Sequence, residues 1–563
     1  MAFTRPWHAH YAPGVPAEIS YERTTLSAAL KRSATRFPNE VALNYMGKLI
    51  TYAELNGMVN ALARALTDIG VRPGDRVATL LPNIPQVTAA IYASFRMGAT
   101  IVPTNPLYTE RELQYQLGDS GAKAVVALDL LAPRLEKVIP DTMVESVIYC
   151  HINDYLPFPK KQLFPLAKKD MYRRVVPSSR IYEFLSLVKS ASTGDFEDAS
   201  SWDGLAALLY TGGTTGVSKG AMLLHSNLSS NVQQWRAWSA DLKDGSESVL
   251  AVFPFFHSAG FTAIQNHSIW AGWKLVLVPR PDPVTITELI RNYHPSIIPG
   301  VPTIFTGLLN NKEFRKLNLS FVKGFFAGAA PLATDTINEL KNLTGATILN
   351  VYGLTETSPL ATGNAWGADF TPGTVGFPLP GTDARIVDLE TGTNDVPAGQ
   401  PGELIFKGPQ VMKGYYQKPE ETSKVLRDGW LYTGDIATMN ENCEIAIVDR
   451  KKDMIIAGGF NIYPNEIDDV LSLHPGILEA CVIGVQDAYR GETVKAYVVA
   501  RPGQSLNEEE VLEHCRKHLT GYKVPRQVRF IDAIPKSAVG KILRREMKAL
   551  DEKLEQERAS KAG

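Results

Sequence analysis

The sequence has few cysteines and no long apolar run. Its four cysteines, Cys150, Cys443, Cys481 and Cys515, lie far apart, without the close spacing of zinc ligands or of a disulfide-rich domain. Isolated thiols of this kind suit a reducing compartment. No stretch of 18 apolar residues could cross a bilayer, and the first residues lack the apolar core of a signal peptide. We therefore expect the chain to stay in the cytoplasm.

The sequence also has no excess of positive or of negative charge. The 58 lysines and arginines are balanced by 59 aspartates and glutamates, which leaves a net charge of -1. A nucleic-acid-binding protein usually carries a strong basic excess, so we expect no nucleic-acid partner and instead small anions held by local charge. The 563 residues, 44% of them hydrophobic, are typical of a large globular protein with several structural units.

The most informative segment follows an apolar run at 205–209 that reads as a buried strand. It is Tyr210-Thr-Gly-Gly-Thr-Thr-Gly-Val-Ser-Lys-Gly220. Glycines let backbone N–H groups approach an anion, hydroxyls add donors, and Lys219 adds a positive charge, so the loop is suited to hold phosphate. It differs from the common nucleotide loop, in which Ser or Thr follows the lysine. A flexible turn is the alternative for this loop taken alone.

Four more unusual segments follow in order: Val351-Tyr-Gly-Leu-Thr-Glu-Thr357, Tyr432-Thr-Gly-Asp435, Asp449-Arg-Lys-Lys-Asp-Met-Ile-Ile-Ala-Gly-Gly459 and Pro535-Lys-Ser-Ala-Val-Gly-Lys541. With the first loop they resemble the adenylate-forming superfamily over nearly the whole chain. Within that superfamily, the residues of the motifs are most similar to those of bacterial long-chain fatty-acid:CoA ligases. This similarity includes Asn105-Pro-Leu-Tyr-Thr109 and Gly459-Phe-Asn-Ile-Tyr-Pro-Asn-Glu466.

The order of apolar patterns predicts an α/β fold. Strand-like runs alternate with helical patterns, which is typical of β-α units and parallel sheets. The predicted elements of this part are strands at 76–81, 124–128, 249–253, 274–278 and 346–351 and a helix at 84–97. From Thr371 on, short strands between Gly and Pro predict a small β-barrel. The last part predicts helices near 464–472, 507–518 and 543–553 and strands near 478–485 and 494–500.

We therefore expect a large N-terminal domain of doubly wound α/β subdomains with the small barrel, followed by a small mobile α+β domain. The predicted boundaries are 1–448 for the AMP-binding domain and 449–563 for the mobile domain, with a hinge at Asp449.

The resemblance implies ATP-dependent activation of a carboxylic acid, namely a medium- or long-chain fatty acid. The acid attacks the α-phosphate of ATP to form an acyl-adenylate and pyrophosphate, and the CoA thiol then displaces AMP to give acyl-CoA. Neither step needs a protein nucleophile, so the protein contributes positioning and charge stabilisation. Mg²⁺ is the implied metal, with ATP and CoA as co-substrates.

Other functions remain open at this stage. The same chemistry could load a carrier-protein phosphopantetheine or use an aryl acid. We expect no carrier domain after the charged stretch 550–563, which favours free CoA and leaves a carrier protein in trans as an alternative. Gly216-Val-Ser-Lys-Gly220 also matches the Gly-x-Ser-x-Gly pattern of a serine hydrolase with Ser218 as nucleophile. That hypothesis leaves the Thr/Gly loop, the segment 432–435 and Lys541 unexplained.

The resemblance also assigns roles to the first loop and to Glu356. Thr211 and Glu356 would share Mg²⁺, a hard ion that prefers oxygen ligands. The loop would hold the β- and γ-phosphates through Thr211, Gly212, Gly213, Thr214, Thr215, Gly216 and Lys219.

The adenosine contacts come from three further segments. Tyr352 would stack on adenine opposite Gly328, Ala329 and Ala330, and Gly353 and Thr355 flank the metal ligand. Asp435, with Arg450, would grip the ribose hydroxyls. The catalytic residues implied by the resemblance are Lys541, Thr211, Glu356 and His257.

Lys541 would swing in to stabilise the charge on the reacting carboxylate and α-phosphate. Rotation of the small domain about Asp449 would then bring a different face, with Gly458, Gly459 and Phe460, to line the pantetheine tunnel. His257 and Phe261 would line the acyl pocket, although core packing accounts for such aromatics nearly as well. The sequence does not specify the length of the acyl chain.

Residues 156–176 form an unusual insertion. Six basic residues and one aspartate are interleaved there with Phe158, Phe164, Met171 and Tyr172. This composition is typical of a reversible interfacial membrane anchor. The alternative is a solvated loop that packs its aromatics on the large domain. The oligomeric state is not predicted.

Overall fold

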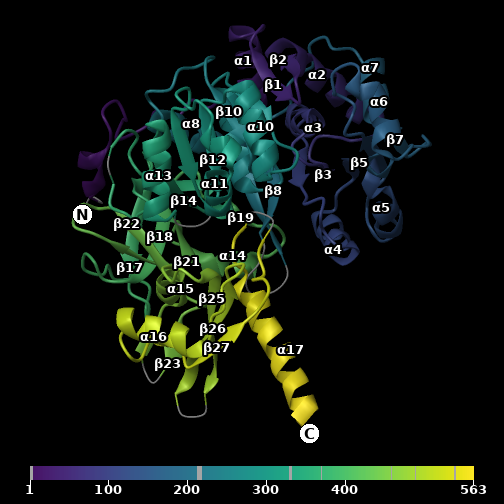
Figure 1. Ribbon diagram of the computed structural model, residues 1–563. Coiled ribbons are helices and arrows are strands. Elements are labelled where there is room, and N and C mark those ends of the chain that lie inside the picture. Colours follow the sequence, from purple (N-terminus) through teal and green to yellow (C-terminus); the bar gives the residue numbers. More distant parts are fainter. Residues whose placement is uncertain are drawn as a thin grey trace. The chain divides into compact units, whose positions relative to one another are not determined.

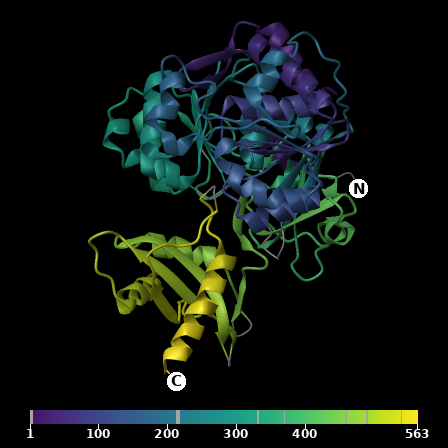
Figure 2. The same cartoon turned by 90° about the vertical axis from the view of Figure 1, so that its right-hand side faces the viewer.

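A computed structural model describes residues 4–211, 218–328, 332–368, 370–457, 460–487, 490–537 and 540–562. The chain divides into two compact units. The large unit comprises Met1–Asp383 and Phe406–Leu431, and the small unit comprises Ala384–Ile405 and Tyr432–Gly563. The elements of each unit can be followed in Figures 1 and 2.

The large unit contains an eight-stranded sheet in the order β19-β9-β8-β4-β3-β5-β6-β7. The strands from β8 to β7 pair in parallel, whereas β8–β9 and β9–β19 are antiparallel. The bounds are β3 (Arg76–Leu80), β4 (Thr100–Pro103), β5 (Ala124–Leu128), β6 (Ser146–Cys150), β7 (Ile181–Glu183), β8 (Leu205–Thr211), β9 (Lys219–Leu224) and β19 (Gly414–Tyr415).

A second sheet of the large unit has nine strands in the order β16-β15-β14-β13-β12-β10-β11-β1-β2. Its central strands, from β14 to β1, are parallel. The bounds are β1 (Val41–Tyr45), β2 (Lys48–Thr51), β10 (Ser248–Ala251), β11 (Lys274–Leu277), β12 (Ile297–Gly300), β13 (Gly324–Ala327), β14 (Thr347–Gly353), β15 (Leu360–Gly363) and β16 (Phe377–Pro378).

Helices follow most of these strands, as alternation of β and α patterns requires. Two begin with a capping box, in which Thr51 pairs with Glu54 and Thr109 with Glu112. The bounds are α1 (Leu26–Arg36), α2 (Tyr52–Asp68), α3 (Pro85–Arg96), α4 (Glu110–Ser120), α5 (Ala132–Val138), α6 (Lys160–Ala167), α7 (Phe184–Ser190), α8 (His225–Trp238), η5 (Ala259–Asn266), α9 (His267–Trp270), α10 (Pro283–Tyr293), α11 (Pro302–Leu309), α12 (Lys312–Arg315), α13 (Thr334–Thr344) and α14 (Pro419–Val425).

The small unit holds most of a five-stranded sheet, in the order β17-β18-β21-β20 with β22 against β21. These strands lie where the sequence predicts a barrel, and β17 and β20 stand at the two ends of the strand order. The bounds are β17 (Asp383–Val387), β18 (Gly402–Lys407), β20 (Leu426–Arg427), β21 (Trp430–Met439) and β22 (Ile445–Arg450).

The rest of the small unit is a second five-stranded sheet with three helices. The sheet has the order β24-β23-β26-β25 with β27 against β26, and α17 packs on β25 through Met547 (Figures 1 and 2). The bounds are β23 (Ile455–Ala457), β24 (Phe460–Ile462), β25 (Ile477–Asp487), β26 (Gly491–Ala500), β27 (Gln527–Phe530), α15 (Pro464–Ser472), α16 (Glu508–His518) and α17 (Arg544–Ala562).

The predicted elements are confirmed to within a few residues, except that α17 extends beyond residue 553. The predicted boundary at Asp449 falls inside the small unit, at the end of β22, and stays a prediction about which part moves. Among the described residues, no helix is long and apolar enough to cross a membrane.

Candidate functional site

The predicted phosphate loop joins the antiparallel strands β8 and β9. Thr211 and Lys219 are paired across this hairpin, so both flank the loop. Ser218 Oγ donates to the Thr211 carbonyl, and the Tyr115 hydroxyl donates to the Ser218 carbonyl at 2.9 Å. Residues 212–217 of the loop lie outside the described part of the chain, and they include the predicted phosphate ligands Gly212, Gly213, Thr214, Thr215 and Gly216.

Lys219 forms an ion pair with Glu421, which projects from α14. Its ammonium group also lies 5.2 Å from the centre of the Tyr415 ring. Lys219 and Lys424 hold the pKa of Glu421 at about 2, so this carboxylate is ionised near neutral pH. Neither Tyr415 nor Glu421 was predicted, because each is far from the loop in sequence and lies outside the quoted motifs.

Glu356 lies in the 3₁₀-helix η6 (Thr355–Thr357), which follows β14. Tyr415 donates its hydroxyl to Glu356 Oε1 at 2.7 Å, and the Glu356 carbonyl accepts the Met412 N–H at 2.8 Å. Burial and the Glu356 carboxylate raise the pKa of Tyr415, so its hydroxyl stays protonated as a donor. Because Tyr415 pairs with Ala221 of β9, it connects Glu356 to the hairpin that carries Lys219.

The two predicted metal ligands carry oxygen donors that suit a hard cation. The Thr211 hydroxyl and the Glu356 carboxylate are oxygen ligands of the type that Mg²⁺ prefers. No group of three or more His, Cys, Asp or Glu side chains that could hold a metal by itself occurs in the described part of the chain.

The predicted adenine residues lie at the ends of β13 and β14. Tyr352 is half-buried, with its ring centroid 6.1 Å from that of Phe406. At Gly353 an added Cβ would meet the Pro359 carbonyl oxygen at 1.8 Å, so no side chain fits there. Thr355 Oγ1 donates to Ser258 Oγ at 3.3 Å. Gly328 follows β13, and Ala329 and Ala330 lie outside the described residues.

His257 precedes the π-helix η5, and Phe261 lies in its first turn. His257 is half-buried, and its Nδ1 accepts the Ala259 N–H at 3.4 Å. Phe261 is fully buried and packs edge-on against Phe95, with 6.2 Å between the ring centroids. Core packing thus accounts for Phe261, and the acyl-pocket roles stay predictions. Single-turn π-segments are frequent at functional sites.

In the small unit, Asp435 and Arg450 are paired across β21 and β22. Arg450 Nε lies 2.9 Å from Asp435 Oδ1, and Asp435 is only 3% exposed. A buried carboxylate held by a guanidinium group is fixed in position.

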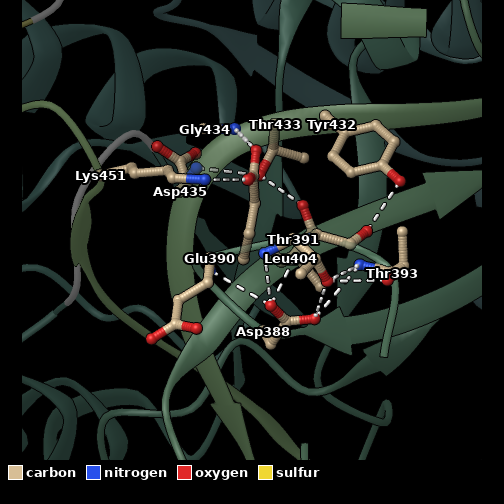
Figure 3. A network of polar contacts seen from close by, with 12 residues as sticks. Asp388, Glu390, Thr391, Thr393, Leu404, Tyr432, Thr433, Gly434, Asp435 and Lys451 are labelled. Carbon is tan, nitrogen blue, oxygen red and sulfur yellow. Dashed lines mark hydrogen bonds and ion pairs between the residues drawn. The ribbon is translucent and has the colours of Figure 1, made fainter. Parts of the chain in front are cut away.

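A polar network positions the backbone before Asp435 (Figure 3). Tyr432 donates its hydroxyl to the Gly392 carbonyl at 2.9 Å, and Thr433 Oγ1 donates to the Leu404 carbonyl at 2.7 Å. The Gly434 N–H donates to Glu403, whose other oxygen pairs with Lys451 at 2.9 Å. Tyr432 and Thr433 therefore support the strand that presents Asp435.

Asp449, the predicted hinge, is almost fully buried. Its two carboxylate oxygens accept the N–H groups of Arg450 at 2.7 Å and of Asn465 at 2.8 Å. Asn465 lies in the first turn of α15, where a negative charge is favourable. Burial raises the pKa of Asp449, and the nearby Arg544 opposes that shift. The hinge function itself stays a prediction.

Lys541 lies at the end of a tight turn. Its N–H donates to Ser537 Oγ at 3.2 Å, its carbonyl accepts the Ser537 N–H at 2.8 Å, and Lys536 and Ile542 form a β-bridge around the turn. Desolvation, followed by the like charge of Arg450, lowers the pKa of Lys541, although the residue is exposed at the surface. Asp435 opposes this shift, so Lys541 lies in the electrostatic field of the Asp435–Arg450 pair.

The predicted CoA-binding segment is described only at Phe460. That ring is 53% exposed and stacks on Tyr522 with 4.5 Å between centroids. Gly458 and Gly459 lie outside the described residues.

A cavity in the large unit lies away from these residues. It is lined at the amino-terminal ends of β4 and β8, by Thr100, Leu205 and the buried His225 among others. The predicted phosphate loop is at the opposite, carboxyl-terminal end of β8. The cavity therefore does not coincide with the predicted site.

The fold, with a loop between β8 and β9 and a separate small α+β unit, defines an adenylate-forming enzyme. The model of the AMP-binding enzyme family matches residues 30–416, and the model of the AMP-binding enzyme C-terminal domain matches residues 466–541. The chain belongs to the AMP-binding enzyme family. Members of this family use ATP and CoA, and this chain is an enzyme that activates an acid to its acyl-CoA.

Three relatives illustrate the similarity. A long-chain-fatty-acid–CoA ligase of Bacillus subtilis is 43% identical over 551 residues, which cover 97% of this chain and 98% of the relative. A long-chain-fatty-acid–CoA ligase of Yersinia pestis is also 43% identical, over 96% of this chain and 97% of the relative. The crystal structure of ATP-bound MatB from Rhodopseudomonas palustris aligns with a TM-score of 0.83 and 31% identity, and covers 94% of this chain and 99% of that one.

Proposed function

We propose that this enzyme is a long-chain fatty-acid:CoA ligase. The observation that carries the proposal is the 43% identity with the Bacillus subtilis ligase along almost the entire length of both chains. The fatty-acid carboxylate attacks the α-phosphate of ATP and releases pyrophosphate, and the CoA thiol then attacks the acyl carbon and releases AMP. A medium-chain acid would be handled by the same chemistry.

In the large unit, the hairpin loop between Thr211 and Lys219 would hold the β- and γ-phosphates. Its glycines and threonines, residues 212–216, would supply backbone and hydroxyl donors. Thr211 and Glu356 would hold Mg²⁺, which when bound offsets phosphate charge. The hydrogen bond from Tyr415 to Glu356 supports this role, because it orients one carboxylate oxygen and leaves the other for the ion.

The adenine ring would lie between Tyr352 and the backbone at Gly328, Ala329 and Ala330. The close packing of Gly353 on the Pro359 carbonyl fixes the backbone that leads to Thr355. His257 would contact the reacting carboxylate, and Phe261 would bound the acyl pocket from within the core.

In the small unit, the Asp435–Arg450 pair would bind the ribose hydroxyls, because a fixed carboxylate accepts two hydroxyl hydrogen bonds at once. Lys541 would stabilise the negative charge that develops during adenylation. Its place in the field of Asp435 and Arg450 supports a common site for these three residues.

The two steps would use different faces of the domain 449–563. Lys541 serves adenylation, whereas Gly458, Gly459 and Phe460 line the path of the pantetheine thiol in thioester formation. Asp449 would be the hinge between the two arrangements, and its hydrogen bonds to Arg450 and Asn465 connect β22 to α15 where the rotation would begin.

The proposal is tested with two assays across a panel of carboxylic acids. ATP:pyrophosphate exchange reports adenylation, and formation of acyl-CoA from supplied acyl-adenylate reports the second step. Fatty acids of long chain should give the highest kcat/KM in both. Aryl acids as better substrates, or a carrier-protein phosphopantetheine as a better acceptor than CoA, would contradict it.

Two variants separate the half-reactions. Lys541→Ala should nearly abolish pyrophosphate exchange and still convert acyl-adenylate to acyl-CoA, whereas Gly459→Leu should do the reverse. Equal loss of both half-reactions in both variants would refute separate roles for the two faces.

We also propose a cytoplasmic location with reversible contact to the membrane surface through residues 156–176. All four cysteines are buried free thiols, which supports a reducing compartment. A membrane contact would bring the enzyme to the phase in which long-chain acids dissolve.

A further inference from the structure

The segment 156–176 concentrates exposed apolar side chains on one short piece of the large unit. Phe158 is 83% exposed, Leu166 71% and Leu163 54%. Val176 and Met171 are exposed as well, so this segment holds a large share of the exposed bulky apolar side chains among the described residues. Helix α6, at its centre, has no buried residue. A monomeric protein rarely leaves such side chains together in water without a function.

Basic side chains are interleaved with these apolar ones. Lys160, Lys168, Lys169, Arg173 and Arg174 are all exposed, and Lys161 is half-buried. Within the described residues, none of these six cations forms an ion pair within 4 Å, so their charges are directed to solvent. The only acidic residue of the segment is Asp170. The surface therefore presents apolar groups surrounded by unneutralised positive charge.

The backbone of this segment is nevertheless held to the fold at both ends. At its start, Asn153 Nδ2 donates to the Lys161 carbonyl at 3.0 Å. At its end, Tyr172 stacks on the buried His151 with 4.7 Å between centroids, and the Arg173 N–H donates to the buried Asp129 at 2.5 Å. Val175 is part of the core.

These contacts oppose the view of the segment as a solvated loop that packs its aromatics away. Tyr172 is packed on His151, whereas Phe158, Leu163 and Leu166 are exposed. The segment joins β6 to β7, the last two strands at one edge of the eight-stranded sheet, so it lies at the periphery of the large unit (Figure 1).

We infer that residues 156–176 form a prebuilt interfacial anchor that docks on an anionic lipid surface, with Phe158, Leu163 and Leu166 entering the headgroup region. The choice of an anionic bilayer follows from charge complementarity with the six cations and from the apolar groups among them. The anchor extends the proposed membrane contact. Only its advantage, which is access to a substrate dissolved in lipid, rests on the proposed function.

Vesicle co-sedimentation of the full-length enzyme tests the anchor. The vesicles would contain phosphatidylcholine with or without 30% phosphatidylglycerol, and binding would be measured at low and at high salt. Binding should require the anionic lipid and weaken with salt, because charge attraction falls off within a Debye length. Each basic residue contributes about a fivefold factor near such a surface. Replacement of Lys160, Lys161, Lys168 and Lys169 by Gln should therefore weaken binding by about 600-fold.

Matched controls separate position from net charge. Replacement of the exposed lysines Lys48, Lys189, Lys312 and Lys553 by Gln removes the same charge elsewhere and should leave binding within about twofold. Likewise Phe158→Ser with Leu163→Ser and Leu166→Ser should weaken binding at least tenfold, whereas serine at the exposed Met143, Val284 and Leu473 should not. Equal effects of segment and control variants would overturn the anchor.

Insertion itself is measured with a polarity-sensitive thiol label. All four native cysteines are buried, so Phe158→Cys gives one accessible thiol, and Met143→Cys gives the control. Emission of the label at 158 should shift to the blue on anionic vesicles, and that of the label at 143 should not. An unshifted label at 158 would overturn insertion.

The outcome is independent of the proposed substrate. An enzyme that binds anionic vesicles but does not activate long-chain acids refutes the proposed function and keeps the anchor. An enzyme that activates long-chain acids but shows no salt-dependent binding refutes the anchor alone.

Discussion

Lys219, at the end of the predicted phosphate loop, forms an ion pair with Glu421 of α14. The two residues are 202 positions apart in sequence. An anionic carboxylate thus occupies the partner position that a phosphate group of ATP is proposed to take. Lys424 pairs with the same carboxylate from the solvent side at 2.5 Å.

Glu421→Gln should lower the KM for ATP by about two- to fivefold, because it releases Lys219 from an opposing charge in a partly exposed ion pair. Steady-state kinetics of pyrophosphate exchange measure it. Lys424→Gln, which leaves the Lys219–Glu421 pair in place, is the matched control and should change the KM by less than twofold. A higher KM for ATP in Glu421→Gln would mean that Glu421 positions Lys219 for phosphate and does not compete with it.

Activity should depend on the protonation of Lys541. Desolvation and Arg450 lower its pKa to about 8, and only the protonated ammonium group can stabilise the developing negative charge. The kcat/KM for adenylation, which reports the free enzyme, should therefore fall as the pH rises through about 8.

Lys541→Arg is the control for this pH dependence, since a guanidinium group stays charged throughout. Its residual kcat/KM should stay flat above pH 8. A wild-type profile that is also flat up to pH 10 would show that the Lys541 proton is not required.

Gly353→Ala should abolish adenylation and destabilise the large unit. The new methyl group would lie 1.8 Å from the Pro359 carbonyl oxygen, so the backbone between β14 and β15 must shift. Thermal unfolding and pyrophosphate exchange measure the two effects. Gly118→Ala in α4 is the control, because no atom lies within 4 Å of its added methyl group and alanine favours a helix. Unchanged stability and activity of Gly353→Ala would contradict the tight packing.

Ser218→Ala should keep activity within about fivefold, because it removes one hydrogen bond, to the Thr211 carbonyl, worth about 1 kcal/mol. The same variant distinguishes a ligase from a hydrolase, in which a lost nucleophile costs several orders of magnitude. Labelling of Ser218 by a fluorophosphonate probe would support the hydrolase.

The local segments of this chain are predictable from sequence because they depend on near neighbours. Strands such as β5 and helices such as α15 have the bounds that their apolar periodicity predicts. The loop that follows β8, the glycine required at 353 and the turn before Asp435 each belong to a short motif. The residues of those motifs and their order along the chain also predict the adenylate-forming family, which the family models confirm.

Tertiary structure alone decided which distant residues complete the candidate site. No local pattern brings Tyr415 to Glu356, or Glu421 to Lys219, because β19 reaches the β8–β9 hairpin only through strand pairing across the sheet. The same holds for Phe261, whose burial against Phe95 depends on the packing of η5 on a helix far earlier in the chain. It holds as well for residues 156–176, where the composition left open both an anchor and a solvated loop that packs its aromatics. There the attachment of Tyr172 and Arg173 to buried partners determines which apolar side chains remain exposed.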